Sequence, residues 1–484
     1  MSRRLGEVLR DYTRIVVWGT GNFYAEYRNL LDERVVYFVD NDAKKWGTLI
    51  DQKEVFSPEK LRGEDKDETL VIICNHFFEE ISAQIKQYGD LDIIDIVTVG
   101  LVRQKERVFS DVKRPEADRA IIVCGGIHAL WQINGSRKFI DGQLKLLHQS
   151  GYHTIEIVPL LYYRTGKRES SLLAVSADGA YQGLFSPGEL AEMYPKVRGM
   201  VIHSLYYSQT TMKTLLESVN VKTRVLYYIH DYSCLCSYRF LYKEKKLCIG
   251  SDGNMICDVC SEDRERRKLL QFYRFLFKKY KVLMIAPSAD TKARVEPFYG
   301  DIDMVEMAHL EFEREVFRKQ VNNRLRIAYL GAAVWNKGWE RFAGLADRFQ
   351  RDYDFYCLGN CPEHLKIQNV AYVSVGLEGA GGDLTMTEAL LQYGIDIAYI
   401  GSILPETYGY TYYEAYEAGL FILTDIRSGN VCRQVNENQN GLSFSCDDEM
   451  AAWLARGNVK RDVQNVNQRI INVRNNKAFL KYFE

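Results

Sequence analysis

Short apolar runs alternate along this chain with longer stretches in which apolar and polar positions recur at helical spacing. Clear examples are RIVVWGTGNFYAEYRNLL from residue 14, AIIVCGGIHALWQINGSRKFIDGQLKLLHQSG from residue 120 and LRIAYLGAAVWNKGWERFAGLADRF from residue 325. Apolar runs bounded by glycine predict buried strands, and the longer periodic stretches predict helices. A regular alternation of strand and helix is typical of parallel α/β sheets.

The alternation occurs in three sets, which predicts three Rossmann-like units. Two of these units could face each other across a cleft, because doubly wound sheets bind ligands at the carboxyl ends of their strands. FSDVKRPEADR, between the first two sets, is charged and contains proline, as linkers do. The expected division is an N-terminal nucleotide-binding-like domain at 1–112, a second domain at 118–308 with an insertion at 231–261, a third domain at 309–465 and a closing helix at 466–484.

Composition narrows the class of protein. The 484 residues are 46% hydrophobic and 26% charged, which is ordinary for a globular protein, and a net charge of -1 gives no general attraction to nucleic acid. The N-terminus lacks the apolar core of a signal peptide, and no apolar run is long enough to span a bilayer. We expect a cytoplasmic protein, with peripheral contact at the inner face of the membrane as an option. Its 11 cysteines should then be thiols or metal-bound thiolates.

The peptide PETYGYTYYEAYEAGLFILTD, at residues 405–425, predicts a loop that enters a helix near Gly409 and is followed by a buried strand. Backbone N–H groups at such a helix start suit a diphosphate. Glu406 lies in the loop and Glu414 lies inside the helix, where its carboxylate could accept two hydrogen bonds from a ribose diol. Spacing alone leaves open a surface helix with two unrelated glutamates.

In this setting the two glutamates resemble the signature of family 4 retaining glycosyltransferases of the GT-B fold. IAYLGAAVWNKGWE and YDFYCLG upstream, and SGNVCRQVNENQNGLSF downstream, extend the resemblance over residues 118–484. The resemblance implies an α/β protein with two facing Rossmann-like domains, here preceded by an additional N-terminal Rossmann-like domain. It implies a hexosyltransferase that uses a nucleotide-sugar donor and a glycan or lipid-linked saccharide acceptor in bacterial cell-surface polysaccharide synthesis.

The resemblance also implies roles for single residues on the donor side. Glu414 would hold the donor ribose, and Glu406 would contact the transferred sugar. Lys337, in WNKGW, would pair with the diphosphate and stabilise charge on the leaving nucleotide, although a solvated lysine at a helix start is the alternative. Many members carry an arginine after the strand glycine, whereas two alanines follow Gly331 here, so Lys337 would carry more of the neutralisation. The candidate catalytic residues are Glu406, His230 and Lys337, and the further donor-binding candidates are Gly331, Thr407, Tyr408 and Gly409.

On the acceptor side, CGGIHALW resembles the family loop whose glycines let the backbone approach both substrates. Gly125 and Gly126 are these candidates, and a tight strand-to-helix turn is the alternative. His203 and His230 each end a predicted strand. The resemblance places His230 within reach of the transferred sugar with Asp231 beside it, whereas His203 could equally be a core histidine.

Five cysteines lie between residues 230 and 260, in HDYSCLCSYRFLYKEKKLCIGSDGNMICDVC. Four soft thiolates in one polar loop, those of Cys236, Cys248, Cys257 and Cys260, suit a tetrahedral structural zinc. The loop looks similar to that of some bacterial members of the family, and this resemblance implies that Cys234 lies outside the ligand set. Unligated thiols and a redox CxxC are the alternatives. We expect no catalytic metal, because GT-B enzymes generally need none and the triplets DND and DID arise readily by chance.

Two segments carry weaker signals. EDRERRKLLQFYRFLFKKYKVLM predicts an amphipathic helix whose basic face could bind anionic lipid, or could be an ordinary solvated face. In the N-terminal GTGNFY, Gly19 and Gly21 precede Tyr24, which stands where a dinucleotide fingerprint has its third glycine, and Asp40 follows at the distance of a ribose-binding acid. Two interpretations of this domain therefore stay open: it binds a nucleotide or NAD, or it is a docking or degenerate domain.

Two rival functions belong to other classes. A non-catalytic nucleotide-sugar scaffold or regulator would bind a donor without turnover. A bifunctional protein would add NAD-dependent sugar chemistry in the first domain, but Tyr24 and the lack of a YxxxK pair in residues 1–110 argue against this.

Overall fold

The computed structural model forms two compact units. The first unit comprises Met1–Trp131, Tyr152–Arg198 and Tyr206–Lys222, and the second comprises Gln132–Gly151, Gly199–Leu205 and Thr223–Glu484. The residues that the structure describes are 9, 11–75, 78–103, 116–125, 135–159, 162–164, 167–168, 173–203, 205, 209–236, 239–243, 246–248, 263–376 and 384–484. Part of the expected linker and of the cysteine-rich insertion therefore lies outside the described residues.

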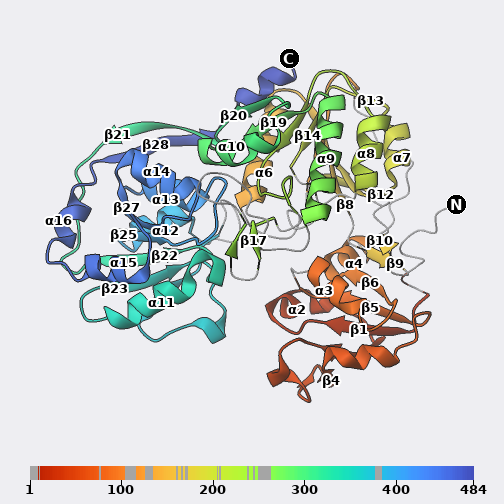
Figure 1. Cartoon of the computed structure of the whole chain (residues 1–484), viewed down its shortest axis with the longest axis horizontal. Helices are drawn as coiled ribbons and strands as arrows, with labels where there is room; N and C mark the ends of the chain where they lie inside the picture. The colour runs from red at the N-terminus through yellow and green to blue at the C-terminus, as the bar shows by residue number, and fades with distance from the viewer. Residues whose placement is uncertain are drawn as a thin grey trace. The chain divides into compact units, whose positions relative to one another are not determined.

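The first unit begins with an eight-stranded sheet in the order β10-β9-β6-β5-β1-β2-β4-β3 (Figure 1). The strands β6, β5, β1, β2 and β4 are parallel, and each successive pair is linked through helical or turn segments, as the alternating pattern predicts. The strands are β1 (Arg14–Trp18), β2 (Val35–Val39), β3 (Leu49–Ile50), β4 (Lys53–Phe56), β5 (Thr69–Ile73) and β6 (Asp92–Asp95). The helices are α2 (Asn22–Tyr27), α3 (Phe78–Ile85) and α4 (Ile96–Arg103), with short η1 (Arg28–Leu30), η2 (Ala43–Lys45) and η3 (Pro58–Gly63).

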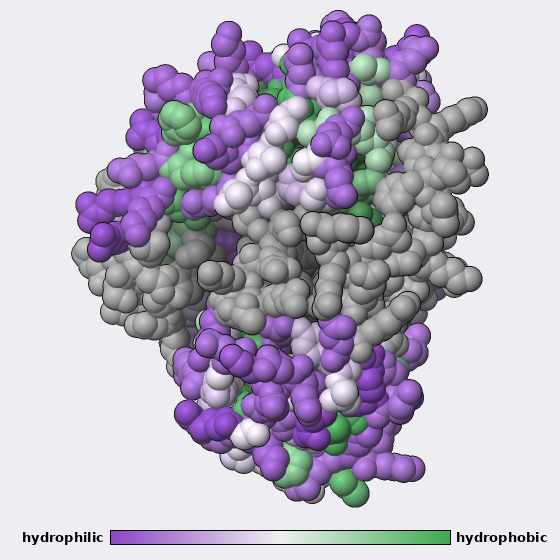
Figure 2. Space-filling view, turned by 90° about the vertical axis from the view of Figure 1, so that its right-hand side faces the viewer, coloured by the Kyte–Doolittle hydropathy of each residue, from purple (hydrophilic) through white to green (hydrophobic). Residues whose placement is uncertain are grey.

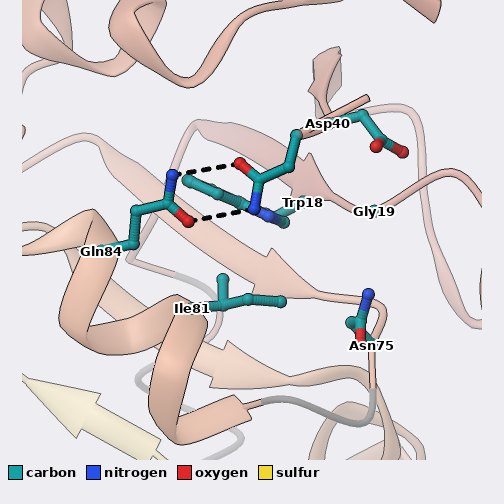
Figure 3. A pocket seen from close by; sticks show the side chains of 7 residues that line it. Trp18, Gly19, Asp40, Asn75, Ile81 and Gln84 are labelled. Atoms are coloured by element: carbon teal, nitrogen blue, oxygen red, sulfur yellow. Dashed lines mark hydrogen bonds between the residues drawn. The ribbon is translucent and has the colours of Figure 1, made fainter. Parts of the chain in front are cut away.

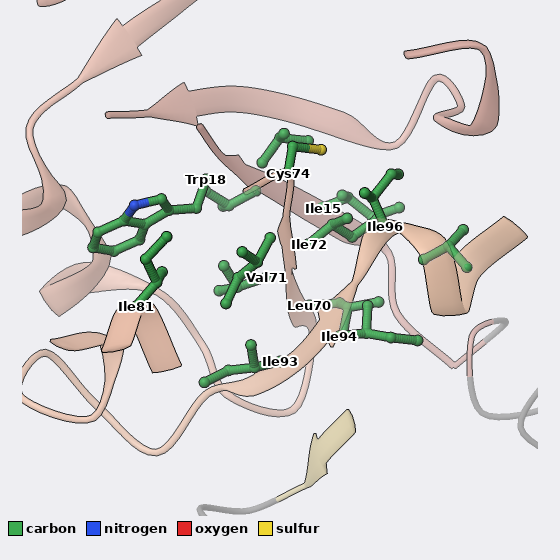
Figure 4. Packing of buried hydrophobic residues seen from close by; sticks show 14 of the residues in the cluster. Ile15, Trp18, Leu70, Val71, Ile72, Cys74, Ile81, Ile93, Ile94 and Ile96 are labelled. Carbon is green, nitrogen blue, oxygen red and sulfur yellow. The ribbon is translucent and has the colours of Figure 1, made fainter. Parts of the chain in front are cut away.

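The core of this sheet is aliphatic and continuous across its central strands (Figure 4). Val16, Val71 and Ile94 come from three neighbouring strands, and each is fully buried. Both faces of a parallel sheet are covered, so its strands read as near-continuous apolar runs such as IVVW and LVII. The large buried cluster and the order of the strands together explain why the strands and helices of the N-terminal part could be predicted from its apolar pattern.

A short hairpin from later in the chain extends the edge of the same sheet. It consists of β9 (Tyr162–Arg164) and β10 (Lys167–Arg168), and β9 pairs antiparallel with β6. The first unit also contains strands in the order β12-β11-β8-β7, with β7 and β8 parallel. Their bounds are β7 (Ala120–Cys124), β8 (His153–Pro159), β11 (Leu173–Ala177) and β12 (Ala180–Phe185), with α7 (Pro187–Met193), α8 (Gln209–Ser218) and the small pair β13 (Lys196–Val197) and β15 (Asn220–Val221).

The second unit contains two sets of parallel strands. One runs in the order β14-β16-β19-β20, namely β14 (Gly199–Ile202), β16 (Val225–Tyr228), β19 (Leu283–Ala286) and β20 (Met304–Glu306). The helices of this part of the chain are α6 (Gly135–Gln149), α9 (Asp263–Lys279), α10 (Ala289–Val295) and the short η6 (Glu296–Phe298). The cysteine-rich insertion contributes the small hairpin of β17 (Tyr242–Lys243) and β18 (Lys246–Leu247).

The other set is a fully parallel six-stranded sheet in the order β24-β23-β22-β25-β26-β27. It comprises β22 (Arg326–Leu330), β23 (Asp354–Leu358), β24 (Val370–Val373), β25 (Ile397–Ile400), β26 (Phe421–Asp425) and β27 (Gly441–Phe444). Its helices are α11 (Trp339–Arg348), α12 (Met386–Gln392), α13 (Tyr410–Glu417), α14 (Asn430–Asn438), α15 (Asp447–Leu454) and α16 (Val459–Gln464), with η7 (Trp335–Lys337) and η8 (Glu363–Leu365). The predicted α/β class with parallel Rossmann-like sheets is confirmed.

The chain terminus differs from the predicted closing helix at 466–484. It forms strand β28 (Gln468–Asn475), which pairs antiparallel with β21 (Leu310–Val316), followed by the short η9 (Ala478–Tyr482) (Figure 1). QRIINVRN contains three β-branched residues, which favour an extended strand, and Ile470 is fully buried against the six-stranded sheet. The spacing of these residues also fits a helix, which is why the pattern alone was misleading.

Among the described residues, no helix is long and apolar enough to cross a membrane. The described side chains on the face in Figure 2 are mostly hydrophilic, with hydrophobic residues scattered among them. Scattered exposed hydrophobic residues are normal for folded proteins, so the described residues on this face give no sign of a broad apolar contact surface.

Candidate active site

The peptide that carries the predicted signature forms the turn between β25 and α13. Helix α13 begins at Tyr410, directly after Gly409, as the sequence predicts. Gly409 has φ 80° and ψ 74°, and a Cβ at this position would lie 2.6 Å from Val431 Cγ2. Both the left-handed backbone and the close approach require glycine here. The glycine thus fixes the direction in which the first N–H groups of α13 point.

Lys337 and Glu406 lie close together in the structure, although they are 69 positions apart in the sequence. Lys337 Nζ lies 3.6 Å from Glu406 Oε1, and both side chains are partly exposed. Lys337 ends the η7 turn after β22, and the next residue, Gly338, has φ 77°. A Cβ on Gly338 would lie 2.4 Å from Gly401 O, so the turn after β22 packs tightly on the turn after β25.

The backbone of Glu406 is held on its other side by the turn before α14. Glu406 N–H donates to Ser428 O at 3.2 Å, and Asn430 N–H donates to Glu406 O at 3.0 Å. Gly429 lies against this peptide, since a Cβ there would be 2.9 Å from Glu406 N and O. Glu406 therefore has a fixed backbone, and only its side chain is free to change partner.

Glu414 makes an ion pair that the sequence did not suggest. Lys138 Nζ, from α6, donates to Glu414 Oε1 at 2.8 Å and lies 5.6 Å from the centre of the Tyr410 ring. The starts of α6 and α13 are in contact, because a Cβ on Gly135 would lie 2.9 Å from Tyr410 Cδ2. Two helix N-termini and two lysines thus surround the two predicted glutamates, which favours an anionic ligand at this place.

Thr407 links the donor-side turn to the strand end at His230. Its hydroxyl donates to His230 O at 2.8 Å. Its own carbonyl accepts hydrogen bonds from Ser288 Oγ at 2.8 Å and Thr291 Oγ1 at 2.9 Å, both at the start of α10. Three hydrogen bonds on one residue fix its position, so Thr407 is better described as a connector than as a ligand contact.

His203 and His230 hydrogen-bond to each other. His203 Nδ1 and His230 Nε2 are 3.0 Å apart, and His203 Nε2 lies 2.8 Å from Gln143 Oε1. Burial lowers the pKa of His230 to about 4 and lowers that of His203 well below its usual range, so both rings are neutral near pH 7. Both predicted histidines therefore belong to one site, together with Gln143, which sequence reasoning missed.

The hydrogen-bond chain assigns the ring tautomers. With Gln143 Oε1 as acceptor, His203 carries its proton on Nε2, and its Nδ1 must accept from His230 Nε2–H. The remaining nitrogen of His230, Nδ1, is then an acceptor. A neutral histidine with one acceptor nitrogen can bind the hydroxyl of a sugar without adding charge.

His309 completes a cluster of three histidines. It is 2% exposed, its ring stacks on Phe139 at 4.0 Å between ring centres, and the ring of His230 is 5.3 Å away. Neither ring nitrogen has a hydrogen-bond partner among the described residues. Burial, followed by the neighbouring His230 and His203, lowers the pKa of His309 well below its usual range. Such unpartnered buried polar atoms are uncommon away from functional sites.

The remaining predicted residues fall in several places. Gly331 has φ 105°, and a Cβ there would meet no described atom within 4 Å, although its N–H donates to Leu358 O at 2.8 Å. Tyr408 is buried, its hydroxyl accepts from Leu310 N at 3.1 Å, and its ring stacks on Tyr413. Asp231 Oδ1 accepts from Ser233 N at 2.9 Å, so its carboxylate stabilises a local turn. Gly125 follows β7 in the first unit, and Gly126 lies outside the described residues.

The cysteine-rich insertion is described only in part. Cys236 and Cys248 are each 4% exposed, and Cys257 and Cys260 lie outside the described residues. Burial raises the pKa of the Cys234 thiol to about 12, which makes this residue an unreactive core thiol. The described residues contain no group of three or more His, Cys, Asp or Glu that could hold a metal ion.

In the first unit, Gly19 ends β1 with φ 99°, and Asp40 follows β2. Burial alone would raise the pKa of Asp40, but hydrogen bonds from Lys45, Thr20 and Asp42 outweigh it and the pKa is lowered. Tyr24 packs edge-on against Phe38, where a glycine of a dinucleotide fingerprint would leave space.

Sequence reasoning missed Lys138, Gln143 and His309, and the first two share a signal that could have found them. Both lie on α6, the helix that follows the Gly-rich segment. His309 carried no such signal, because it precedes a linking strand and no motif surrounds it.

Comparison with known proteins gives weak likenesses. The family model described as C2185-like, N-terminal, matches residues 11–94, and no curated protein matches the chain. Among solved structures, the chain is similar to Anabaena Alr3699/HepE in complex with UDP, with 11% identity over 72% of this chain and 91% of that one and a TM-score of 0.44.

Two further structures give similar values. WaaG, a glycosyltransferase involved in lipopolysaccharide biosynthesis, has 12% identity over 71% of this chain and 94% of that one, with a TM-score of 0.42. Staphylococcal (S. aureus) TarM has 10% identity over 94% of this chain and 93% of that one, with a TM-score of 0.41. These values identify neither substrate nor mechanism, so the assignment of an activity depends on the site residues themselves.

Proposed function

We propose that the chain is a retaining glycosyltransferase that moves a sugar from a nucleoside diphosphate to a glycan or lipid-linked saccharide. The assignment as a family 4-like hexosyltransferase of cell-surface polysaccharide synthesis belongs to the same proposal. The observation that carries it is the pairing of two lysines with the two signature glutamates, Lys337 with Glu406 and Lys138 with Glu414.

The charges and the helix starts suit a diphosphate between them. The first N–H groups of α13 and the ammonium of Lys337 would bind the phosphate oxygens. Lys138 occupies Glu414 Oε1, and we place the ribose diol on the other oxygen of that carboxylate. Glu406 and the acceptor nitrogen of His230 would bind hydroxyls of the transferred sugar.

The proposed transfer occurs on one face of the sugar. The bond between the sugar's anomeric carbon and the phosphate oxygen breaks, and a bond from the acceptor oxygen to the same carbon forms on the face that the phosphate leaves. The acceptor proton passes to the departing phosphate oxygen, so the atoms balance without a protein base. Lys337 would stabilise the negative charge that develops on the nucleoside diphosphate.

A structural zinc is part of the proposal for the insertion. Cys236 and Cys248 are buried, and thiolates are suitable zinc ligands. Together with Cys257 and Cys260 they would hold one Zn²⁺ ion and fix the chain that follows His230. The metal would stabilise this segment without taking part in the transfer.

The test measures nucleotide binding and donor consumption separately. UDP, GDP and their hexose conjugates are titrated into the pure chain by calorimetry, and donor hydrolysis is followed by release of the nucleoside diphosphate. Glu414→Ala should weaken binding of the preferred nucleotide at least about tenfold, because hydrogen bonds to a charged group are worth about 1.5–3 kcal/mol. Lys337→Ala should lower turnover more than it lowers affinity, because its charge acts mainly in the transition state.

A matched control is Glu417→Ala, which removes a glutamate of the same helix that hydrogen-bonds to Thr387 instead. This variant should keep both nucleotide affinity and turnover. Full activity in Glu414→Ala and Lys337→Ala would contradict the proposed donor site. Tight binding without turnover against a broad set of saccharide acceptors would instead favour a nucleotide-sugar scaffold.

A further inference from the structure

The first unit contains a separate pocket of about 250 Å³ at the carboxyl edge of its sheet (Figure 3). Gly19, Asp40 and Asn75 line it from the ends of β1, β2 and β5, and Ile81 and Gln84 line it from α3. In the strand order, β1 lies between β5 and β2, so the strand that follows β1 in the chain, β2, and the later strand β5 are placed on opposite sides of β1 at this point of the sheet. Parallel α/β sheets bind ligands at such a position.

Close packing of the strand ends forms the hollow. Cys74 N–H donates to Trp18 O at 2.8 Å, and a Cβ on Gly19 would lie 2.8 Å from Cys74 O. With φ 99°, Gly19 turns the chain away from the sheet immediately after this contact. The backbone at the ends of β1 and β5 therefore forms one wall of the pocket, and side chains form the rest.

The carboxylate of Asp40 is not available to accept hydrogen bonds from both hydroxyls of a ribose diol. Its Oδ2 accepts hydrogen bonds from Thr20 N, Thr20 Oγ1 and Lys45 Nζ, at 3.0, 2.6 and 2.8 Å, and its Oδ1 accepts from Asp42 N at 2.9 Å. Each carboxylate oxygen offers about two lone-pair sites, so Oδ2 is fully used and Oδ1 keeps one site, too few to accept both hydroxyls of a ribose diol. The acid that a dinucleotide would need is thus engaged by the chain itself.

The described lining of the pocket offers no positive charge for a phosphate. None of the described residues that line it is cationic, and the nearby Lys45 is paired with Asp40. A phosphorylated ligand would therefore be buried without a counter-charge, which is costly.

The lining instead presents neutral amides beside apolar carbon. Asn41 and Gln84 hydrogen-bond reciprocally, with both N–O distances 3.0 Å, and Figure 3 shows Gln84 across the pocket from Asn75. Each paired amide oxygen retains one lone pair, and Asn41 retains one N–H, whereas the second N–H of Gln84 donates to Tyr88 Oη at 3.5 Å. Trp18 and Ile81 supply the apolar part of the lining. Amides next to apolar side chains suit an uncharged ring that carries hydroxyl groups.

We propose that this pocket binds one uncharged polyol ring, either a single saccharide or the ribose of an unphosphorylated nucleoside, through Asn41, Asn75 and Gln84. The volume is below the range of about 300–1,000 Å³ that is typical for drug-sized ligands, which fits one ring better than a nucleotide sugar. This pocket is separate from the proposed donor site, so the test of ring binding does not depend on the proposed transferase activity.

Hydrogen–deuterium exchange of the full chain tests the site, because it reports binding by region. The probes are N-acetylglucosamine, glucose, uridine and adenosine, each at millimolar concentration, with UMP and AMP as charged counterparts. At least one neutral probe should slow exchange in residues 73–85. Gln84→Leu should weaken that binding about tenfold, since it removes a hydrogen-bonding side chain of similar size. Preference for the monosaccharides or for the nucleosides identifies the source of the ring.

Gly21→Ala is the matched control. Gly21 has φ -90°, and an added Cβ would meet no described atom within 4 Å, so the fold should accept alanine. In a dinucleotide site the corresponding backbone contacts the pyrophosphate, and alanine there would block binding. The neutral ring should bind Gly21→Ala and Glu414→Ala as it binds the native chain. The proposal is overturned if no neutral probe protects residues 73–85, or if UMP or AMP binds better and Gly21→Ala abolishes that binding.

Discussion

Gly409→Ala is the substitution for which the structure gives the most definite expectation. The residue sits between the signature loop and α13, with φ 80° and ψ 74°. Alanine must either adopt this left-handed conformation or shift the start of the helix. Either outcome changes the place where the backbone N–H groups would bind a diphosphate.

The cost has two parts. The left-handed conformation costs a residue with a Cβ about 1–2 kcal/mol. The new Cβ would lie 2.6 Å from Val431 Cγ2, and Val431 is fully buried, so overpacking adds about 1–3 kcal/mol. The free energy of unfolding should therefore fall by about 2–5 kcal/mol. For a domain of 150–250 residues this lowers the unfolding midpoint by at least about 4 °C.

The assay is thermal unfolding followed by calorimetry, with nucleotide binding measured on the same preparations. Gly344→Ala is the control, because Gly344 is exposed within α11 and an added Cβ would meet no described atom within 4 Å. The same chemical change should there raise the free energy of unfolding by about 0.5–1 kcal/mol. If Gly409→Ala unfolds at the native temperature and binds nucleotide normally, the reasoning about this turn is wrong.

Two further predictions concern acid and metal. Because burial lowers the pKa of His203, His230 and His309 below the unfolded value of about 6.5, the unfolded chain binds more protons under acid conditions. The stabilising contribution of these histidines is complete above pH 6.5, and denaturation midpoints should decline as the pH falls from 6.5 toward 4. His309→Leu should make that decline shallower. If the midpoint of His309→Leu falls with pH as steeply as that of the native chain, the buried His309 ring is not neutral. Purified chain should contain zinc by elemental analysis and lose it in the Cys257→Ser, Cys260→Ser double variant but not in Cys234→Ala; native chain without zinc would refute the metal site.

The parallel sheets were predictable because each strand is covered on both faces and therefore reads as an apolar run. The strands RIAYL and FILTD are examples, since all but the first position of the former are buried. The helix start at Gly409 was predictable for a different reason: glycine is the residue that such a turn requires. Lys337 and Glu406 lie in turns after neighbouring parallel strands, β22 and β25, so the topology itself brings them together.

Contacts that depend on three-dimensional packing were not predictable in the same way. The pairing of Lys138 with Glu414 joins residues 276 positions apart on two helices, and no local pattern specifies that approach. The strand β28 was mistaken for a helix because the apolar spacing of its residues fits both periods, and pairing with β21 decided the outcome. His309 has no hydrogen-bonding motif around it, and only its ring contacts reveal that it joins the histidine cluster.

The two lysine–glutamate pairs would explain how the proposed donor site holds both anionic and hydroxyl groups. Without a ligand, each carboxylate beside a helix start is neutralised by a lysine, which avoids two unpaired charges in a partly buried place. A diphosphate would attract Lys337 away from Glu406, and the freed carboxylate could then accept hydroxyls of the sugar. The anchored backbone of Glu406 and the three hydrogen bonds of Thr407 would keep the site in place during this exchange. In the proposed donor site, the two ion pairs would keep the charges balanced until a ligand that bears both phosphate and hydroxyl groups replaces both lysine–glutamate contacts.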